Sequence, residues 1–157
     1  MIKILLDTTY LLPIFGIGIS LREYSKVFPA LLDKYEVYYN PASIIEAKWV
    51  TIRLLKTYPN KKQRILSRFR LGLKVLLSSE RIRQTELTNP KIEEVSDILL
   101  DIGLKDYFDR LIYATATTYK MILLTEDRVI HEIAQKKSIP KPPEVIRWEN
   151  IVSTLIR

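Results

Sequence analysis

Short apolar runs alternate along the chain with longer segments in which apolar residues recur every three or four positions. The short runs are rich in branched and aromatic side chains and predict strands at residues 2–6, 36–39, 82–87, 121–125 and 145–148. The longer segments predict helices at residues 20–35, 41–57, 61–78, 90–100, 106–119, 127–137 and a last turn or two near the end. This alternation favours an α/β fold of three layers, with a central, mostly parallel β-sheet flanked by helices. We expect one domain over residues 1–157.

The segment 61–78 has the clearest helical period. At about 100° per residue, Leu71 falls outside one apolar arc, whose members are Ile65, Leu66, Phe69, Leu73, Leu76 and Leu77. Residues 61–74 include no acid, and their basic residues are Lys61, Lys62, Arg64, Arg68, Arg70 and Lys74. All of these except Lys62 lie outside the arc. We therefore predict a helix with a core face and a basic flank, which is either simply solvated or binds phosphate.

Composition narrows the classes of function. The formal net charge of +7 favours an anionic partner, either nucleic acid or an acidic membrane surface. The absence of cysteine excludes disulfides, thiolate nucleophiles and cysteine zinc sites, so oxygen atoms are the ligands left for a metal. Asp7 and Pro13 interrupt the first apolar stretch, which argues against a signal peptide. No other run approaches the roughly 18 residues of a membrane span. We expect a cytoplasmic protein with no membrane association.

Four acidic residues occur where a parallel sheet brings side chains together. Asp7 and Asp127 follow predicted strands, Glu46 lies early in the helix after the second strand, and Asp109 opens an apolar helix with Asp106 three residues earlier. Ligands of open parallel sheets bind outside the carboxyl ends of the strands. Two carboxylates ~4 Å apart repel by about 4 kcal/mol at an effective dielectric near 20, whereas a helix N-terminus offsets only ~0.3 to 1 kcal/mol. The cluster therefore predicts Mg²⁺ or Mn²⁺, and with it phosphodiester hydrolysis.

Four runs carry these acids in a fixed order: LLDTTYLL, SIIEAKW, KDYFDRLIYATA and ILLTEDRVI. Together they resemble the PIN-domain family of nucleases, which includes the VapC-type toxins of prokaryotic toxin–antitoxin pairs. The resemblance spans nearly the whole chain. It implies an endoribonuclease dependent on Mg²⁺ or Mn²⁺, often a homodimer and often inhibited by a small antitoxin protein. By motif, the implied catalytic and metal-binding residues are Asp7, Glu46, Asp109 and Asp127, with Thr9, Asp106 and Thr125 in support.

Basic residues near these motifs are candidates for binding the RNA substrate. Arg53 and Lys56 lie seven and ten residues beyond Glu46 on the same predicted helix, and Arg110 follows Asp109. With the basic flank, the predicted RNA-binding residues are Arg53, Lys56, Lys61, Arg64, Arg68 and Arg110. Trp49 lies close to the second motif, where it could narrow the groove. His131, the only histidine, has no partner motif, and we expect it to be solvated.

Other interpretations remain open at this level. Asp7 and Asp127 are also ordinary helix caps, and Glu46 alone would be a solvated helix residue. A PIN-like protein that binds RNA or assembles without catalysis would keep the same residues. Phosphatases of the haloacid-dehalogenase type need Asp-x-Asp after the first strand, where this chain has Thr9 in place of the second acid. The acidic pair, nucleophilic aspartate and lysine of a phosphoacceptor domain are not found.

Overall fold

The computed structural model describes residues 1–156 and is built on a five-stranded sheet. The strands lie in the order β3-β2-β1-β4-β5, and every neighbouring pair is parallel. Their bounds are β1 Lys3–Leu6, β2 Glu36–Tyr39, β3 Ile82–Gln84, β4 Ile122–Leu124 and β5 Val145–Ile146. Leu6 at the end of β1 is in register with Tyr39 of β2 and Leu124 of β4. The three central strands therefore end at one level, in the middle of the molecule.

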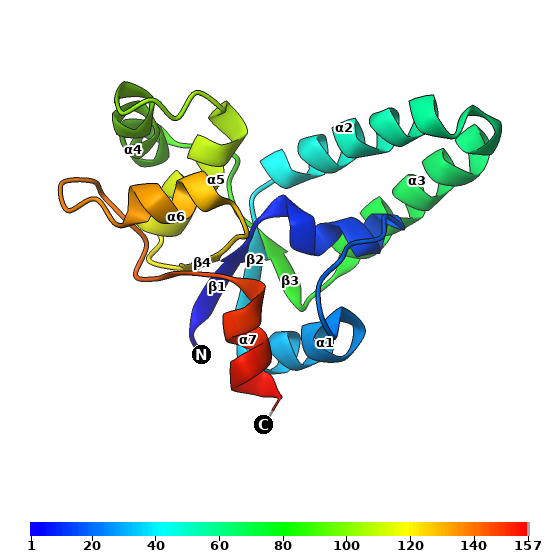
Figure 1. Cartoon of the computed structure of the whole chain (residues 1–157), viewed down its shortest axis with the longest axis horizontal. Coiled ribbons are helices and arrows are strands. Elements are labelled where there is room, and N and C mark those ends of the chain that lie inside the picture. The colour runs from blue at the N-terminus through cyan, green and yellow to red at the C-terminus, as the bar shows by residue number, and fades with distance from the viewer. Residues whose placement is uncertain (157) are drawn as a thin grey trace.

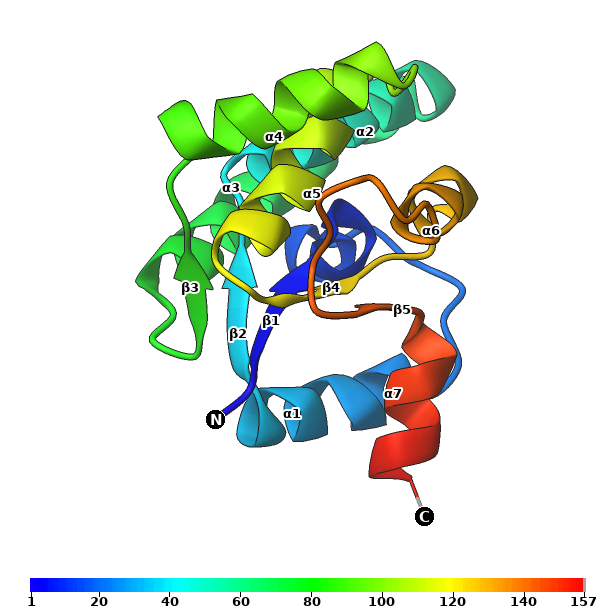
Figure 2. The ribbon, with the colours of Figure 1, turned by 90° about the vertical axis from the view of Figure 1, so that its left-hand side faces the viewer.

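Helices cover both faces of the sheet and confirm the three-layer α/β prediction. Figure 2 shows α4 and α5 above the sheet and α1 and α7 below it. The α-helices are α1 Tyr24–Lys34, α2 Ala42–Thr57, α3 Lys62–Ser78, α4 Pro90–Asp101, α5 Tyr107–Thr118, α6 Arg128–Ala134 and α7 Trp148–Leu155. Two 3₁₀ helices, η1 Thr8–Phe15 and η2 Pro59–Lys61, complete the set. No helix within residues 1–156 is long and apolar enough to cross a membrane.

The central strand serves both layers of the core. Ile4 and Leu6 of β1 belong to the cluster formed with α1, α7 and η1. Leu5, between them, belongs to the cluster formed with α4, α5 and α6. All three side chains are fully buried, because successive residues of a strand point to opposite faces and both faces are covered.

Two details differ from the pattern expected of the sequence. Proline commonly interrupts a helix, but Pro29 lies inside α1, which runs through it to Lys34. Leu77 belongs to the predicted apolar arc of α3 but is 58% exposed, whereas Leu76 is buried. The reason is that α3 packs chiefly on η1 and α2, and these two elements cover a narrower strip than the arc.

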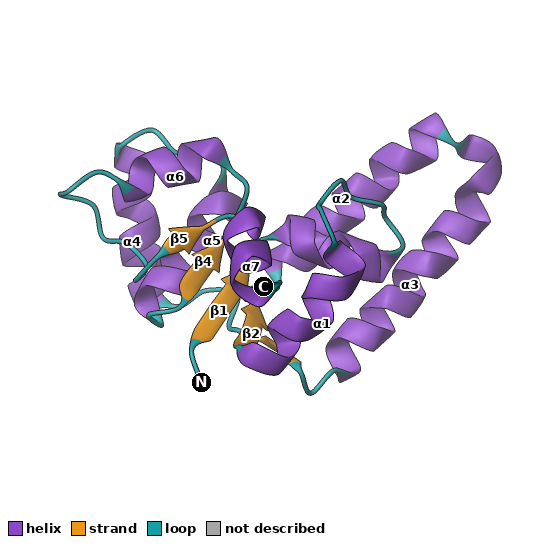
Figure 3. Ribbon diagram, turned by 60° about the horizontal axis from the view of Figure 1, so that its bottom comes forward, coloured by secondary structure: helices purple, strands orange, loops and turns teal. Residues whose placement is uncertain are grey.

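The antiparallel pair α2 and α3 extends away from the sheet, as Figures 1 and 3 show. Its anchor is the contact of α3 with η1, the element that directly follows Asp7. Gly72 lies at the closest approach, where an added Cβ atom would stand 2.3 Å from Ile14 O and 2.8 Å from Phe15 Cα. Only glycine lets the backbones of α3 and η1 approach this closely.

We predict that Gly72→Ala destabilises the protein. Alanine would gain ~1 kcal/mol in helix propensity, but its Cβ would meet backbone atoms of η1 that cannot turn away, and overpacking of this kind costs roughly 1–3 kcal/mol or more. A lower midpoint of urea unfolding is the expected result. Gly18→Ala is the matched control, because an added Cβ there meets no atom within 4 Å. Equal midpoints for both variants would contradict the packing argument.

Candidate active site

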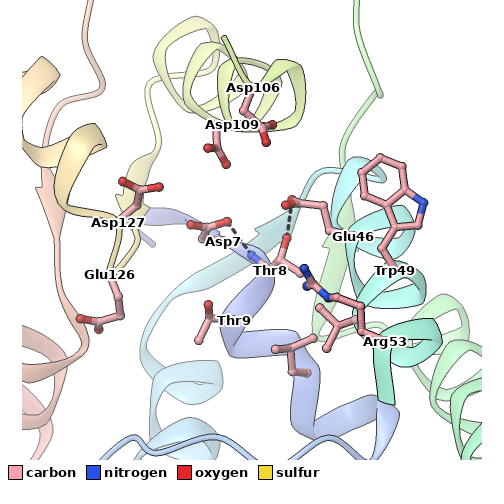
Figure 4. Close-up of a pocket in the computed structure, with 12 residues that line it drawn as sticks. Asp7, Thr8, Thr9, Glu46, Trp49, Arg53, Asp106, Asp109, Glu126 and Asp127 are labelled. Carbon is pink, nitrogen blue, oxygen red and sulfur yellow. Dashed lines mark hydrogen bonds between the residues drawn. The ribbon is translucent and has the colours of Figure 1, made fainter. Parts of the chain in front are cut away.

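Acidic side chains from four separate parts of the chain meet at the carboxyl end of the sheet (Figure 4). Asp7 follows β1 and precedes η1, and Asp127 lies between β4 and α6. Glu46 is the fifth residue of α2, which begins at Ala42. Asp106 immediately precedes α5, and Asp109 lies in its first turn. The parallel topology thus brings together residues that are up to 120 positions apart in the sequence.

These side chains line one open cavity of about 520 Å³. Its acidic residues are Asp7, Glu46, Asp106, Asp109, Glu126 and Asp127, and Arg53 is the one basic residue that lines it within the described part of the chain. Thr8, Thr9, Leu12, Trp49 and Val50 complete the lining. Among residues 1–156, only Glu126 of the six acids takes part in an ion pair, with Arg147. The cavity is therefore strongly negative inside a protein of positive net charge.

Asp7 is fixed from both sides by neutral donors. The backbone N–H of Thr8 donates to its Oδ1 at 2.7 Å, and the hydroxyl of Thr125 donates to its Oδ2 at 2.6 Å. The Asp7 N–H donates to Leu124 O at 3.0 Å, which ties this position to the end of β4. The carboxylate consequently keeps one orientation without having its charge cancelled.

Glu46 is held by a threonine in the same way. The Thr8 hydroxyl donates to Glu46 Oε1 at 2.7 Å and lies 3.0 Å from the hydroxyl oxygen of Ser43. Thr8 and Ser43 are both buried. Thr9, for which we predicted a supporting role, lines the cavity, but its side chain makes no hydrogen bond to an acid in the described part of the chain; Thr8 makes that bond instead.

Besides Asp7, which caps η1, two of the acids cap α-helices. Asp106 accepts a hydrogen bond from the N–H of Asp109 at 3.1 Å. Asp127 Oδ1 accepts from Val129 N at 2.8 Å and from Ile130 N at 3.3 Å. Each cap leaves the second carboxylate oxygen free of these bonds, so the capping role and a role in the cavity are compatible.

Burial and mutual repulsion raise the pKa values of the central acids. Burial is the largest cause for Asp7, whose pKa is raised above its ordinary value despite the hydrogen bonds from Thr125 and Thr8. Burial, followed by the charges of Asp7 and Asp106, raises the pKa of Glu46 to about 7. Burial, and then the charges of neighbouring acids with Asp106 first, raises the pKa of Asp109 to about 7. A positive charge nearby would favour their charged forms.

The residues present fit a hard divalent cation in donor chemistry and in charge. All candidate ligands are carboxylate or hydroxyl oxygens, which suit Mg²⁺ and Mn²⁺, and a divalent ion would offset the repulsion that raises the pKa values. Within residues 1–156, no three acidic or histidine side chains stand close enough to enclose an ion as they lie. Ligation would thus require side-chain adjustment or water molecules between acid and ion, and Mg²⁺ characteristically keeps several waters.

Five of the six predicted RNA-binding residues fall into three groups. Arg53 lines the acidic cavity, and Lys56 is exposed further along α2. Lys61, Arg64 and Arg68 line a second cavity of about 250 Å³ between η1 and the hairpin formed by α2 and α3. This second cavity combines its three cations with Tyr58 and with the apolar side chains of Phe15, Ile17, Leu54 and Ile65.

Arg110 is a correction to the sequence prediction. Its side chain is buried, and its guanidinium donates to Leu104 O at 2.9 Å, to Lys105 O at 2.6 Å and to Ser96 Oγ at 3.2 Å. These bonds close the loop between α4 and α5. The position next to Asp109 suggested a contact with RNA, but on a helix adjacent residues point about 100° apart, and Arg110 faces the core.

Three polar residues near the cavity were not anticipated. Thr8 was overlooked in favour of its neighbour. Glu126 accepts hydrogen bonds from Tyr10 Oη at 3.0 Å and from Trp148 N at 2.8 Å, so it joins the cavity wall to α7. His131, expected to be solvated, is half-buried with Nε2 2.8 Å from Thr125 O. The adjacency of Glu126 to Asp127 was the one available signal for these roles.

Comparison with known proteins agrees with this arrangement. The family model described as PIN domain matches residues 4–136. VapBC2 from Rickettsia felis, solved bound to a DNA fragment from their promoter, is 14% identical with a TM-score of 0.60, over 93% of this chain and 97% of that chain. PAE2754 from Pyrobaculum aerophilum is 18% identical with a TM-score of 0.62, over 98% and 96% of the two chains.

At these identities the two structures establish a common fold and no more. No curated protein sequence matches the chain. The family model spans most of the described residues, from the first buried residue of β1 to the end of α6, and includes all four of the sequence motifs. On that match, the chain belongs to the PIN domain family.

Proposed function

We propose that this PIN-domain protein is an endoribonuclease that depends on Mg²⁺ or Mn²⁺ and is the toxin of a VapC-like toxin–antitoxin pair. The observation that carries the proposal is the convergence of six acids on one cavity at the carboxyl edge of a parallel sheet, with Arg53 as the only cation. Unpaired carboxylates with raised pKa values are expected where a protein prepares a site for a cation. Membership of the PIN family supports a nuclease.

In this proposal Asp7, Glu46, Asp109 and Asp127 hold the ion, and Asp106 adds charge at the rim. When bound, a divalent ion activates a water molecule and stabilises the negative charge that develops on the phosphate. Thr8 and Thr125 keep Glu46 and Asp7 oriented through the hydrogen bonds described above. Arg53 supplies a positive charge on the same wall, where it can bind a phosphate oxygen of the substrate.

The proposed partners follow from the family and from charge. RNA is the substrate, and Lys56, Lys61, Arg64 and Arg68 extend the contact along the hairpin of α2 and α3. The R. felis structure is of a VapBC pair, which supports a small antitoxin as the protein partner; a homodimer is the assembly that we expect for the toxin. A PIN protein that binds RNA without cleaving it is the alternative, and the experiments below separate the two.

We predict that Asp7→Asn reduces the rate of RNA cleavage at least 100-fold. Asparagine keeps the size of the side chain but removes the charge that would hold the ion, and loss of one essential electrostatic group typically has an effect of this order. The measurement is cleavage of structured and unstructured RNA with Mn²⁺, with and without EDTA. Asp97→Asn, an exposed acid on α4 outside the cavity, is the matched control. Undiminished cleavage by Asp7→Asn would refute the assigned site.

The stability of the metal-free protein should fall as the pH rises. Glu46 and Asp109 have pKa values of about 7 in the folded chain and about 4 when unfolded. Each therefore binds its proton more tightly in the folded state, so the stability it adds is complete below pH ~4 and is lost as the pH rises through 7. Only part of this linkage energy should be seen, because both half-buried groups are screened by water.

The expected result is a Tm at least ~3 °C higher at pH 5 than at pH 8, which corresponds to ~1 kcal/mol in a chain of this length. Asp109→Asn should show a smaller difference because its side chain cannot ionise. Mn²⁺ should raise Tm more at pH 8 than at pH 5, since ligands bind metal in their deprotonated form. An equal rise at both pH values would argue against ligation by these carboxylates.

The basic flank of α3 should set the salt dependence of RNA binding. If Lys61 and Arg64 each neutralise one phosphate, the double variant Lys61→Gln/Arg64→Gln should reduce the slope of log K against log salt by about 1.4 for single-stranded RNA. The slope is measured by titration at several salt concentrations. Arg83→Gln is the control, because Arg83 is already paired with Glu36 at 3.0 Å. Equal slopes for the double variant and the parent would place RNA elsewhere.

A further inference from the structure

Trp49 is exposed at the edge of the acidic cavity. Its side chain is 52% accessible to water, although tryptophan has a large apolar surface that proteins usually bury in part. Figure 4 shows the indole at the rim beside Glu46, with Arg53 further along the same helix. Packing of the core does not explain why a tryptophan lies exposed at this position. Binding of a ligand would explain it.

The ring is held in place from one side. Trp49 packs against Phe108 of α5 with ring centroids 5.0 Å apart and an interplanar angle of 80°, an edge-to-face contact. This contact joins α2 to α5, the helix that carries Asp109. A ring that is braced on one side and 52% exposed is a rigid platform with a surface left for a planar partner.

The spacing along α2 connects this platform to the proposed chemistry. Glu46, Trp49 and Arg53 lie at intervals of three and four residues, which places them on one face of the helix, and all three line the acidic cavity. At 1.5 Å per residue, Trp49 is ~4.5 Å along the helix axis from Glu46. An acid for the metal, an aromatic surface and a cation for phosphate therefore follow one another within about two helical turns.

We propose that Trp49 stacks on an unpaired nucleobase next to the phosphodiester bond that is cleaved. The proposal rests on the proposed function, because it assumes that the scissile phosphate lies at the acids. Stacking on an aromatic side chain needs a free base face, which a base inside a duplex does not offer. Arg53 binds the phosphate on the far side of the stacked nucleotide.

A protein partner is the competing occupant. Ile45 and Ile52 are also exposed, at 40% and 42%, and with Trp49 they follow the i, i+4, i+7 spacing of a helix stripe. Neither isoleucine lines the acidic cavity. If the stripe served a second protein or a second copy of the chain, Ile52 and Trp49 would matter alike. If Trp49 binds a base, only Trp49 should matter for RNA.

The first experiment measures binding in the Asp7→Asn background with Mg²⁺, where cleavage does not interfere. A labelled single-stranded oligoribonucleotide is titrated by anisotropy, and tryptophan fluorescence is recorded. Trp148, the only other tryptophan of the chain, is 1% exposed, so quenching that is lost in Trp49→Phe reports on position 49. The substitutions compared are Trp49→Phe, Trp49→Leu and Ile52→Ala, with melting curves to establish that each variant is folded.

We expect quenching by the oligonucleotide and a Kd at least about fivefold higher in Trp49→Leu, a change at the lower end of measured base stacking. Trp49→Phe should keep most of the affinity, because its ring still stacks. An abasic ribose-phosphate oligomer of the same length should bind the parent and Trp49→Leu equally, and a duplex should cause no quenching. Unchanged Kd in Trp49→Leu, or an equal loss in Ile52→Ala, would overturn the proposal.

Cleavage then separates this inference from the proposed function. Metal-dependent cleavage that does not distinguish single-stranded from duplex RNA and is unaffected by Trp49→Leu would overturn the stacking role and leave the nuclease intact. Loss of cleavage in Trp49→Leu only on base-bearing substrates would support the stacking role. Base-dependent quenching in a protein that cleaves no RNA would support stacking of bases on Trp49 and overturn the nuclease.

Discussion

Six acids share one cavity in which Arg53 is the single cation among the described residues, and the surroundings of the cavity follow from this constraint. Asp7 and Glu46 are oriented by a backbone N–H and by the hydroxyls of Thr125 and Thr8. A lysine or arginine in their place would relieve the repulsion, but it would also occupy the position that a metal ion needs. Neutral donors fix the geometry and leave the charge uncompensated. Burial first, and then the charges of neighbouring acids, raise the pKa values of Glu46 and Asp109 to about 7.

The parallel sheet brings these acids together. The end of β1 is in register with the ends of β2 and β4. The helices that follow these strands, η1, α2 and α6, each begin within a few residues of the strand end. The N-termini of η1 and α6 therefore face the same region, and α5, which follows α4 and not a strand, brings its N-terminus there as well (Figure 4). The capping residues of these three helices are Asp7, Asp127 and Asp106. Capping and metal binding are not rival explanations for these acids, since a carboxylate has two oxygens. The partial positive charge at each helix start offsets only ~0.3–1 kcal/mol per acid, so the need for a cation persists.

The sequence predicted the frame and the convergence of the acids, but not the bonds that hold them. The strand from 36 to 39 and the helices near 42–57 and 62–78 were predictable because their hydrophobic periods differ and because proline and asparagine separate them. The position of Asp7 was predictable because a charged residue interrupts an apolar run. Whether Thr8 or Thr9 bonds to Glu46 depends on how the 3₁₀ helix η1 is rotated about its axis. Two adjacent threonines in the sequence do not determine that rotation. The burial of Arg110 depended on loop carbonyls 5 and 6 residues away, whose direction is set by tertiary packing.

In the proposed nuclease, the basic residues of the α2 and α3 hairpin that attract RNA lie apart from the acidic cavity in which cleavage is proposed. The net charge of +7 draws a polyanion toward the protein at long range, and the exposed cations of the hairpin face it at close range. The cavity has the opposite sign, so a phosphate group meets repulsion there until a divalent ion reduces the negative charge. Under the proposed function, RNA would be held along the hairpin with or without an ion, whereas the scissile phosphate would enter the acidic cavity only with the ion. Arg53 connects the two regions. Among the described residues it is the one cation that lines the cavity, and it lies on α2, the helix that leads to the basic flank.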